Sequence, residues 1–428
     1  MFTDPIAEAY AGCSQLVALC DPSAVRMAYH QGRLLEAYGL NDIASYGVES
    51  FDQMLDEQQP DTVIICTVDA CHDEYIIRSI ARGCDVICEK PITTDAEKCR
   101  RLLAAIPPSG QSVRVTFNMR WIPGLTQVKK LLRSGTIGEV KHVHLEYMLN
   151  TSHGADYFRR WHSEKINSGG LLVHKSTHHF DIVNWLVERV PDTIYAQGSL
   201  VYYGKENAEK RGESPLTRYE RYTGHDAASD PFHIDLSKDE FQRGLYLNAE
   251  TETGYVRDRN VFRSGIDIED SMSVIVKYRN GPTMSYSLNA YCPYEGFRLH
   301  LSGDKGRIEY EERHAAHIRQ NARESLEHGT MPSTWKRLTL LPLFERPQEI
   351  PVQELPGGHG GGDPLLQEQM FSDQPSPDDL GRNAGYEQGI ASAIIGISAN
   401  QSMVTGRPMR VADLLSEEFA SKDFRSMI

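Results

Sequence analysis

The chain has 428 residues, of which 40% are hydrophobic and 24% charged, the composition of an ordinary globular protein. Its formal net charge of -14 excludes nucleic acid and anionic membranes as expected main partners, because phosphate groups attract basic surfaces. No apolar run is long enough to span a bilayer, and no basic, apolar leader follows Met1. A chain of this length predicts two domains.

The cysteines indicate a reducing compartment. Seven of the eight lie in the first hundred residues, and no pair has the C-x-x-C spacing of zinc or thioredoxin-type sites. We therefore expect buried free thiols and a cytoplasmic location, although a signal lost with a truncated start would escape this reasoning.

Residues 1–121 alternate apolar strands with helical patterns. Strands are predicted at 16–21, 62–68, 85–91 and 112–118, and helices at 23–39, 48–58, 72–83 and 96–106. This alternation predicts a Rossmann-like, doubly wound parallel sheet. Ligands of such sheets bind outside the carboxyl ends of the strands, where five polar residues fall: Asp21, Thr67, Glu89, Lys90 and Asn118.

The second domain is predicted over residues 122–428. From about residue 139 the strands alternate partially, and turn signals such as "NGP" (280–282) and "GDKG" (303–306) separate some of them. This pattern predicts a mostly antiparallel, open-faced sheet. A polar insertion at 204–245 is expected to be a loop or lid, residues 353–382 are rich in Gly, Pro and Asp, and a helix is predicted at 385–406.

The start of the chain lacks a feature of dinucleotide-binding sheets, which open with a strand and G-x-G-x-x-G. Residues 4–11 are typical of the helix after such a loop. The strand at 16–21 then corresponds to the second strand, with Asp21 at the position of the ribose-binding acid. We expect an upstream truncation that removed the first strand and loop. A real loss of the phosphate cradle is the alternative.

Three segments together resemble the Gfo/Idh/MocA oxidoreductases: "CEKPITTDAEKCRRLL" (88–103), "VTFNMRWIP" (115–123) and "SGGLLVHKSTHHFDIVNWL" (168–186). The resemblance covers about residues 3–325. It implies that the first domain binds NAD(P) and that a sugar, cyclitol or related polyol binds against the second domain's sheet. It also implies a homo-oligomer, a dimer or tetramer, formed through that sheet.

The resemblance implies catalytic roles for two residues. Lys90 falls beside the hydride-transfer carbon, where an ammonium group can stabilise a developing alkoxide. His178 falls on the family's general base. The family's orienting aspartate, four residues earlier, is His174 in this chain, so Lys175 is a candidate partner or acid.

Further residues are predicted to bind cofactor or substrate. Asp21 would accept hydrogen bonds from a ribose diol and repel a 2′-phosphate, which favours NAD, while Ser23 and Arg26 keep NADP open. Histidines four residues apart can bind zinc, but a third ligand is not evident, so no metal is expected. The predicted cofactor-binding residues are Asp21, Thr67, His72, Glu89, Lys90 and Asn118, and the substrate-binding residues are Arg120, Tyr157, Arg160, Trp161, His162, His174 and Asp181.

The expected reaction is hydride transfer between a sugar-like secondary alcohol and a nicotinamide. Two alternatives stay open. One is an NAD-dependent glycosidase of the same family, which oxidises its substrate transiently. The other is a non-catalytic relative that binds a sugar or a protein partner.

Overall fold

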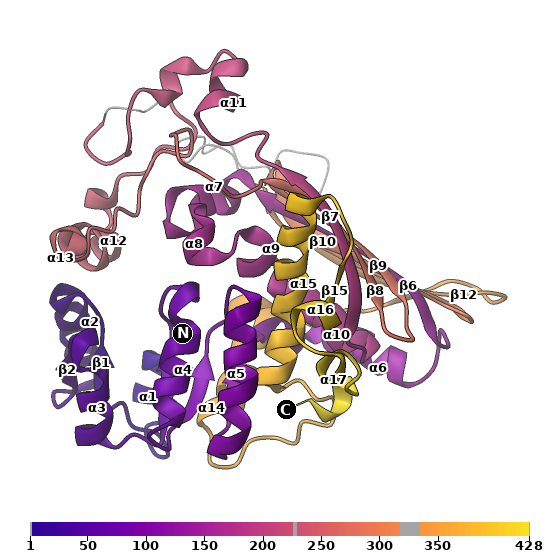
Figure 1. Ribbon diagram of the computed structural model, residues 1–428, viewed down its shortest axis with the longest axis horizontal. Coiled ribbons are helices and arrows are strands. Elements are labelled where there is room, and N and C mark those ends of the chain that lie inside the picture. The colour runs from indigo at the N-terminus through magenta and orange to yellow at the C-terminus, as the bar shows by residue number, and fades with distance from the viewer. Residues whose placement is uncertain (1, 226–228, 317–333, 428) are drawn as a thin grey trace.

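The computed structural model describes residues 2–225, 229–316 and 334–427 (Figure 1). A helix-rich N-terminal domain lies beside a domain built on one large sheet, as Figure 1 shows. None of the helices in the described part of the chain is long and apolar enough to cross a membrane.

The first domain has the predicted alternation of strands and helices. Its strands are β1 (Ala18–Cys20), β2 (Ala44–Tyr46), β3 (Thr62–Ile65), β4 (Asp85–Cys88) and β5 (Val113–Val115). Its helices are α1 (Thr3–Ala7), α2 (Ala24–Tyr38), α3 (Phe51–Gln58), α4 (His72–Ile80) and α5 (Ala96–Ser109). The strands pair in parallel, so the Rossmann-like class is confirmed.

The parallel strands fall into two hydrogen-bonded groups. One is β1 with β2, and the other has the order β14-β5-β4-β3, in which β14 (Ala384–Gly385) is an antiparallel edge strand. The division falls between β1 and β3. In a doubly wound sheet of order 3-2-1-4-5-6, this is the place of the first strand, which the sequence was predicted to lack.

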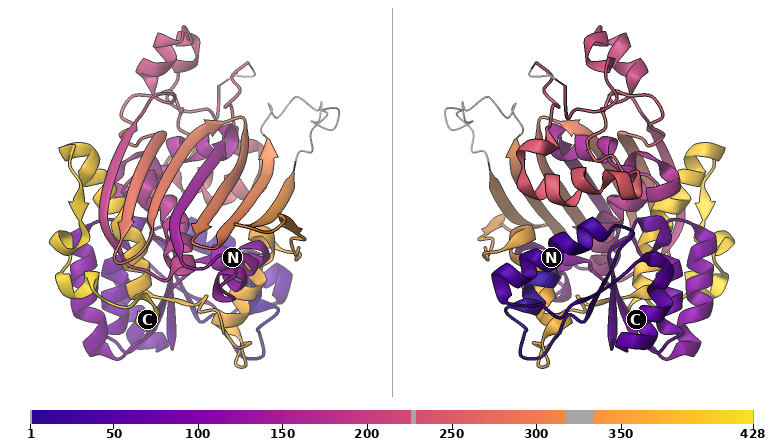
Figure 2. Two further views of the ribbon diagram at one scale, coloured as in Figure 1. Left: turned by 90° about the vertical axis from the view of Figure 1, so that its right-hand side faces the viewer. Right: turned by 90° about the vertical axis from the view of Figure 1, so that its left-hand side faces the viewer.

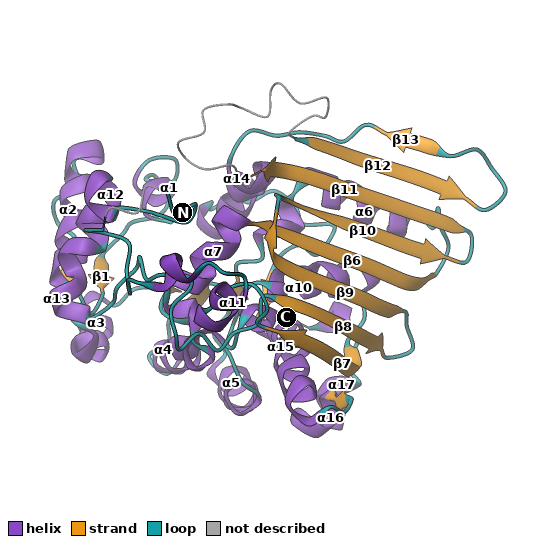
Figure 3. Cartoon of the chain, turned by 90° about the horizontal axis from the view of Figure 1, so that it is seen from above, coloured by secondary structure: helices purple, strands orange, loops and turns teal. Residues whose placement is uncertain are grey.

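The second domain is built on nine strands in the order β13-β12-β11-β10-β6-β9-β8-β7-β15 (Figure 3). Among the described strands of this sheet only β6 and β9 are parallel neighbours, so the prediction of a mostly antiparallel sheet is confirmed. The strands are β6 (Val140–Asn150), β7 (Pro191–Ser199), β8 (Ser271–Tyr278), β9 (Thr283–Cys292), β10 (Tyr294–Gly303), β11 (Gly306–Ala316), β12 (Trp335–Pro342), β13 (Gln348–Ile350) and β15 (Met409–Arg410).

Helices cover one face of this sheet and leave the other open (Figure 2). In β8, Met272, Val274 and Val276 are buried, whereas Ile275 between them is 52% exposed. This period-two alternation is the pattern of a sheet with one packed face. The covering helices include α6 (Pro123–Arg133), α10 (Ser176–Val187) and α15 (Tyr386–Thr405), and α15 confirms the helix predicted at 385–406.

The C-terminal part of the chain returns to the first domain. A helix that the sequence did not predict, α14 (Gly358–Phe371), occupies the Gly/Pro/Asp-rich stretch. Its last residue, Phe371, packs with Ile6 and Ile87, while β14 extends the sheet beside β5. Phe371 and β14 therefore pack with the domain predicted to end at residue 121.

The polar insertion also reaches the first domain. In the structure the inserted segment runs past the predicted end at residue 245 to the end of α13, and it contains the short helices α11 (Lys205–Lys210), α12 (Glu240–Leu245) and α13 (Glu250–Thr253). In both Figure 1 and Figure 3, α12 and α13 lie next to α2. The segment expected to be a loop or lid thus packs against the first domain.

Candidate active site

The Glu89-Lys90-Pro91 turn follows β4 at the carboxyl end of the sheet. The buried imidazole of His72 lies beneath this turn, with Nδ1 2.7 Å from the carbonyl oxygen of Pro91 and Nε2 3.2 Å from that of Thr67. Burial lowers the pKa of His72 to about 4, so the ring is neutral at neutral pH. His72 thus supports the turn that carries Lys90, and its predicted contact with a cofactor stays a prediction.

Lys90 reaches across to the second domain. Its Nζ donates to the carbonyl oxygen of His174 at 3.0 Å and lies 3.5 Å from Nε2 of the same residue. His174 ends the short helix α9 (Leu171–His174), four residues before His178. On the other side of the ring, Nδ1 of His174 is 2.5 Å from Oδ2 of Asp69.

Asp69 is a site residue that the sequence prediction omitted. It lies just after β3, at the same sheet edge that pointed to Thr67 and His72, so the strand-end rule could have found it. The position four residues before His178 carries an imidazole instead of the family's aspartate. Asp69, which belongs to the first domain, supplies a carboxylate that contacts this imidazole.

Desolvation shifts the pKa of each of the three residues in this contact, Lys90, His174 and Asp69. Burial lowers the pKa of Lys90, although the carboxylates of Asp69 and Glu89 oppose the shift. Burial also lowers the pKa of His174 well below its usual range and raises that of Asp69 well above its own. Proton-transfer groups at active sites are commonly tuned in this way.

An aromatic wall surrounds the His174 imidazole. The ring centroids of His162, Tyr157 and Trp161 lie 4.1, 5.6 and 5.6 Å from that of His174. Arg160, in the same segment, is held by Asp156 at 2.9 Å. The structure thus gathers five predicted substrate-binding residues of the second domain beside Lys90. Aromatic and polar groups together are typical of small-molecule sites.

The two other predicted catalytic residues lie on the same helical segment. The Lys175 Nζ is 5.1 Å from the ring centroid of Tyr147, and burial lowers the pKa of Lys175 to about 8. The His178 ring packs edge-on against Phe117 at 6.0 Å. Because Phe117 follows β5, His178 faces the first domain, as Lys90 faces the second.

Arg120 and Asp181 require a correction. They were predicted to bind substrate, yet both side chains are essentially inaccessible and bind each other through two contacts of 2.7 and 2.5 Å. Arg120 also donates to Gln388 and to the carbonyl oxygen of Gly381. No face of either charged group is open to a ligand, so the pair is structural.

The remaining cofactor candidates lie at the strand ends. The Thr67 residue is exposed, the Glu89 carboxylate accepts from the backbone N–H of Lys90, and the buried Asn118 amide donates to Asp363 at 3.0 Å. Asp21 directly follows β1 and accepts from the backbone N–H of Ser23 at 2.8 Å.

These positions fit the two ends of a dinucleotide. Asp21 stays the predicted contact of an adenosine ribose and Lys90 the predicted contact of a nicotinamide. Within residues 2–225, 229–316 and 334–427, no segment matches G-x-G-x-x-G, so no residues are assigned to the pyrophosphate. The same ranges contain no group of three His, Cys, Asp or Glu side chains that could hold a metal ion.

The Rossmann-like domain, the open-faced sheet and the Lys–His contact between them define a dinucleotide-dependent oxidoreductase. Two family models match the chain: "Oxidoreductase family, NAD-binding Rossmann fold" over residues 3–117, and "Oxidoreductase family, C-terminal alpha/beta domain" over residues 129–411. The chain belongs to the Gfo/Idh/MocA oxidoreductase family, as the resemblance predicted.

Individual relatives agree with this assignment. The protein YteT of Bacillus subtilis (strain 168) is 34% identical over 97% of this chain and 95% of its own length. The inositol 2-dehydrogenase of Rhizobium meliloti (strain 1021) is 30% identical over 37% of this chain and 46% of its own length. The aldose-aldose oxidoreductase of Caulobacter crescentus, complexed with glycerol, shares the fold, with a TM-score of 0.59, 16% identity and 96% of each chain covered.

Proposed function

We propose that the protein transfers a hydride between a nicotinamide cofactor, with NAD favoured over NADP, and a secondary alcohol of a sugar, cyclitol or related polyol. One observation carries the proposal: Lys90 from the first domain contacts His174 of the second, whose ring the aromatic wall surrounds. When bound, the cofactor supplies the hydride acceptor at nicotinamide C4.

In this proposal the chain's own residues handle the proton and the developing charge. His178 takes the proton from the substrate hydroxyl, and the Lys90 ammonium stabilises the oxygen as negative charge develops on it. The His174 carbonyl and the Asp69–His174 hydrogen bond fix the position of Lys90 Nζ. The rings of Tyr157 and Trp161 limit the water around the reacting carbon.

The test is a screen of sugars and cyclitols with NAD and NADP, followed by the absorbance of the reduced nicotinamide. Lys90→Met should lower kcat by about 1,000-fold, the scale of acid–base and charge stabilisation. Lys205→Met, an exposed lysine of the insertion, is the matched control and should leave kcat unchanged. Unchanged turnover in Lys90→Met would refute the proposed role of Lys90.

The same screen separates the alternatives. A glycosidase of this family would release a sugar from a glycoside without accumulating reduced cofactor, because the hydride returns within each turnover. Failure to bind either nucleotide in calorimetry would favour a non-catalytic binding protein and would count against the proposal.

We also propose that the open face of the nine-stranded sheet pairs with a second copy of the chain. Exposed Ile275 lies on this face, where association would bury it. Light scattering should give the mass of a dimer or tetramer, and Ile275→Lys should shift that mass toward the monomer.

A further inference from the structure

The tip of the insertion is packed against the helix that follows the ribose-binding strand. Phe241 contacts Tyr29 of α2 edge-on at 6.3 Å. A Cβ on Gly244 would lie 2.4 Å from a ring carbon of the same tyrosine, so glycine allows this close approach. Figure 3 shows α12 and α13 beside α2.

The insertion also engages Arg26, one of the two residues that kept NADP open as a cofactor. The Arg26 Nε donates to the carbonyl oxygen of Leu245 at 3.0 Å. The rings of Tyr246 and Tyr255 each lie 5.8 Å from the guanidinium carbon. Arg26 Nη1 is 3.6 Å from Asp21, so its charge is shared between the insertion and the predicted ribose-binding acid.

Glu252 engages the other residue, Ser23. Its Oε2 accepts from the Ser23 hydroxyl at 2.5 Å and from the backbone N–H of Val25 at 3.2 Å. Ser23 is the N-cap of α2, a position where a carboxylate is favourable because the helix dipole is positive there. The Glu252 carboxylate therefore holds the donors that would otherwise be offered to an anion beside Asp21.

We propose that Glu252, supplied by the insertion of the second domain, is a specificity-determining residue that excludes a 2′-phosphate from the adenosine-ribose corner. The proposal rests on the proposed function, because it places the ribose at Asp21. A 2′-phosphate would meet two carboxylates and find Ser23 and Val25 already occupied. The diol of NAD carries no charge and can donate to Asp21.

The prediction for a variant follows from the donors that Glu252 occupies. Glu252→Gln removes the negative charge and leaves only a neutral, weaker acceptor on the Ser23 hydroxyl and the Val25 N–H, which a phosphate can displace because hydrogen bonds to a charged acceptor are stronger. The residue is exposed and belongs to a short helix, so the substitution leaves the core untouched.

The experiment uses 2′,5′-ADP and 5′-AMP as probes, measured by calorimetry on the full chain. These probes report the ribose corner without the pyrophosphate contact or hydride transfer. Glu252→Gln should bind 2′,5′-ADP at least about tenfold more tightly than the unmodified chain, while affinity for 5′-AMP changes less than about twofold. Glu240→Gln removes an exposed carboxylate from α12 and should leave both affinities unchanged.

Equal binding of 2′,5′-ADP by the unmodified chain and Glu252→Gln, or no binding by either, would overturn the inference. So would an equal gain in Glu240→Gln, since it would show an effect of net charge alone. If no sugar is oxidised but the tenfold contrast appears, the proposed reaction fails and the specificity role of Glu252 stands.

Discussion

Two groups of buried charged side chains connect residues 171–187 to the first domain, and they differ in how completely their charges are paired. Arg120 and Asp181 form a two-contact ion pair with almost no exposed surface. Lys90 instead donates to a neutral carbonyl and lies beside the imidazole of His174. Both are polar contacts between domains, yet only the second leaves a charged group that a ligand could use.

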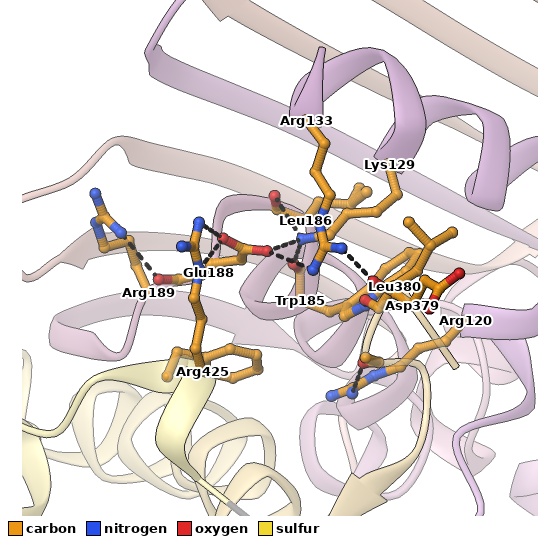
Figure 4. Close-up of polar contacts among 12 residues, drawn as sticks. Arg120, Lys129, Arg133, Trp185, Leu186, Glu188, Arg189, Asp379, Leu380 and Arg425 are labelled. Carbon is orange, nitrogen blue, oxygen red and sulfur yellow. Dashed lines mark hydrogen bonds and ion pairs between the residues drawn. The ribbon is translucent and has the colours of Figure 1, made fainter. Parts of the chain in front are cut away.

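A third cluster, centred on the Glu188 carboxylate, also has its charges paired (Figure 4). Lys129 and Arg133 both approach Oε1 of Glu188, at 2.8 and 3.3 Å, and Arg425 binds the other oxygen of this carboxylate. Lys129 also donates to the carbonyl oxygen of Trp185. A carboxylate with three cations holds the C-terminal segment in place. Burial of charge alone therefore does not indicate catalysis.

The largest expected effect is a loss of stability on breaking the Arg120–Asp181 pair, in which both charges are paired. Asp181→Leu leaves the Arg120 guanidinium buried without its counter-charge, and such losses cost about 3–5 kcal/mol of unfolding free energy. Urea denaturation should show this loss. At a temperature where the variant is folded, KM should be unchanged, because neither residue faces a ligand.

The double variant Arg120→Leu/Asp181→Leu is the control. It removes both charges and should recover much of the lost stability, since an apolar replacement of a buried pair is commonly tolerated. A raised KM in Asp181→Leu with unchanged stability would restore the original prediction that Asp181 binds substrate.

The next effect concerns Lys175, whose pKa is lowered by burial from 10.5 to about 8. Between pH 8 and 10.5 the unfolded chain binds more protons here than the folded chain, so this residue destabilises the fold most below pH 8. The difference of 2.5 pKa units corresponds to about 3 kcal/mol. Relative to the unmodified chain, Lys175→Met should be most stable below pH 8 and lose that advantage by pH 10.5.

Denaturation of both proteins at several pH values checks this expectation. Lys129 also has a pKa lowered to about 8, but it is present in both proteins and cancels in the difference. A difference in unfolding free energy that does not change between pH 7 and 10.5 would show that Lys175 is not desolvated.

The sequence could predict the fold because each domain follows a local pattern. Alternating strand and helix patterns predicted the first domain. Partial period-two alternation of apolar and polar residues predicted the open-faced sheet. The pairing of β14 with β5 was not predictable, since its two residue pairs, Ala384 with Val115 and Gly385 with Arg114, lie 269 and 271 positions apart in the chain. The helix α14 was missed because its glycines argue against a helix when neighbouring segments are unknown.

The site was predicted in part for the same reason. Strand ends located Lys90, and motif spacing located the segment of His174 and His178. Asp69 and Glu252 act through contacts 105 and 229 residues apart, which spacing along the chain does not reveal. Arg120 and Asp181 were misassigned because a buried ion pair and a polar pocket use the same residue types.

The smallest expected effect tests whether the Lys90–His174 contact is functional. Asp69→Asn keeps the size of the side chain but removes the charge that orients His174 and supports the protonated form of Lys90. As a positioning residue, Asp69 should affect kcat more than KM, by about 10–100-fold. The pKa of Lys90 should also fall, which moves the corresponding limb of the pH–rate profile to lower pH.

A matched substitution separates this effect from loss of packing. Asp73→Asn changes a second buried aspartate four residues away, whose partner is Arg101 at 2.9 Å. Both variants lose a buried negative charge. Asp69, however, contacts His174, which in turn contacts Lys90, whereas Asp73 is paired with Arg101. A displaced pH profile in Asp69→Asn alone would support the positioning role. The same displacement in both variants would mean that the Lys90–His174–Asp69 contact is as structural as Arg120–Asp181.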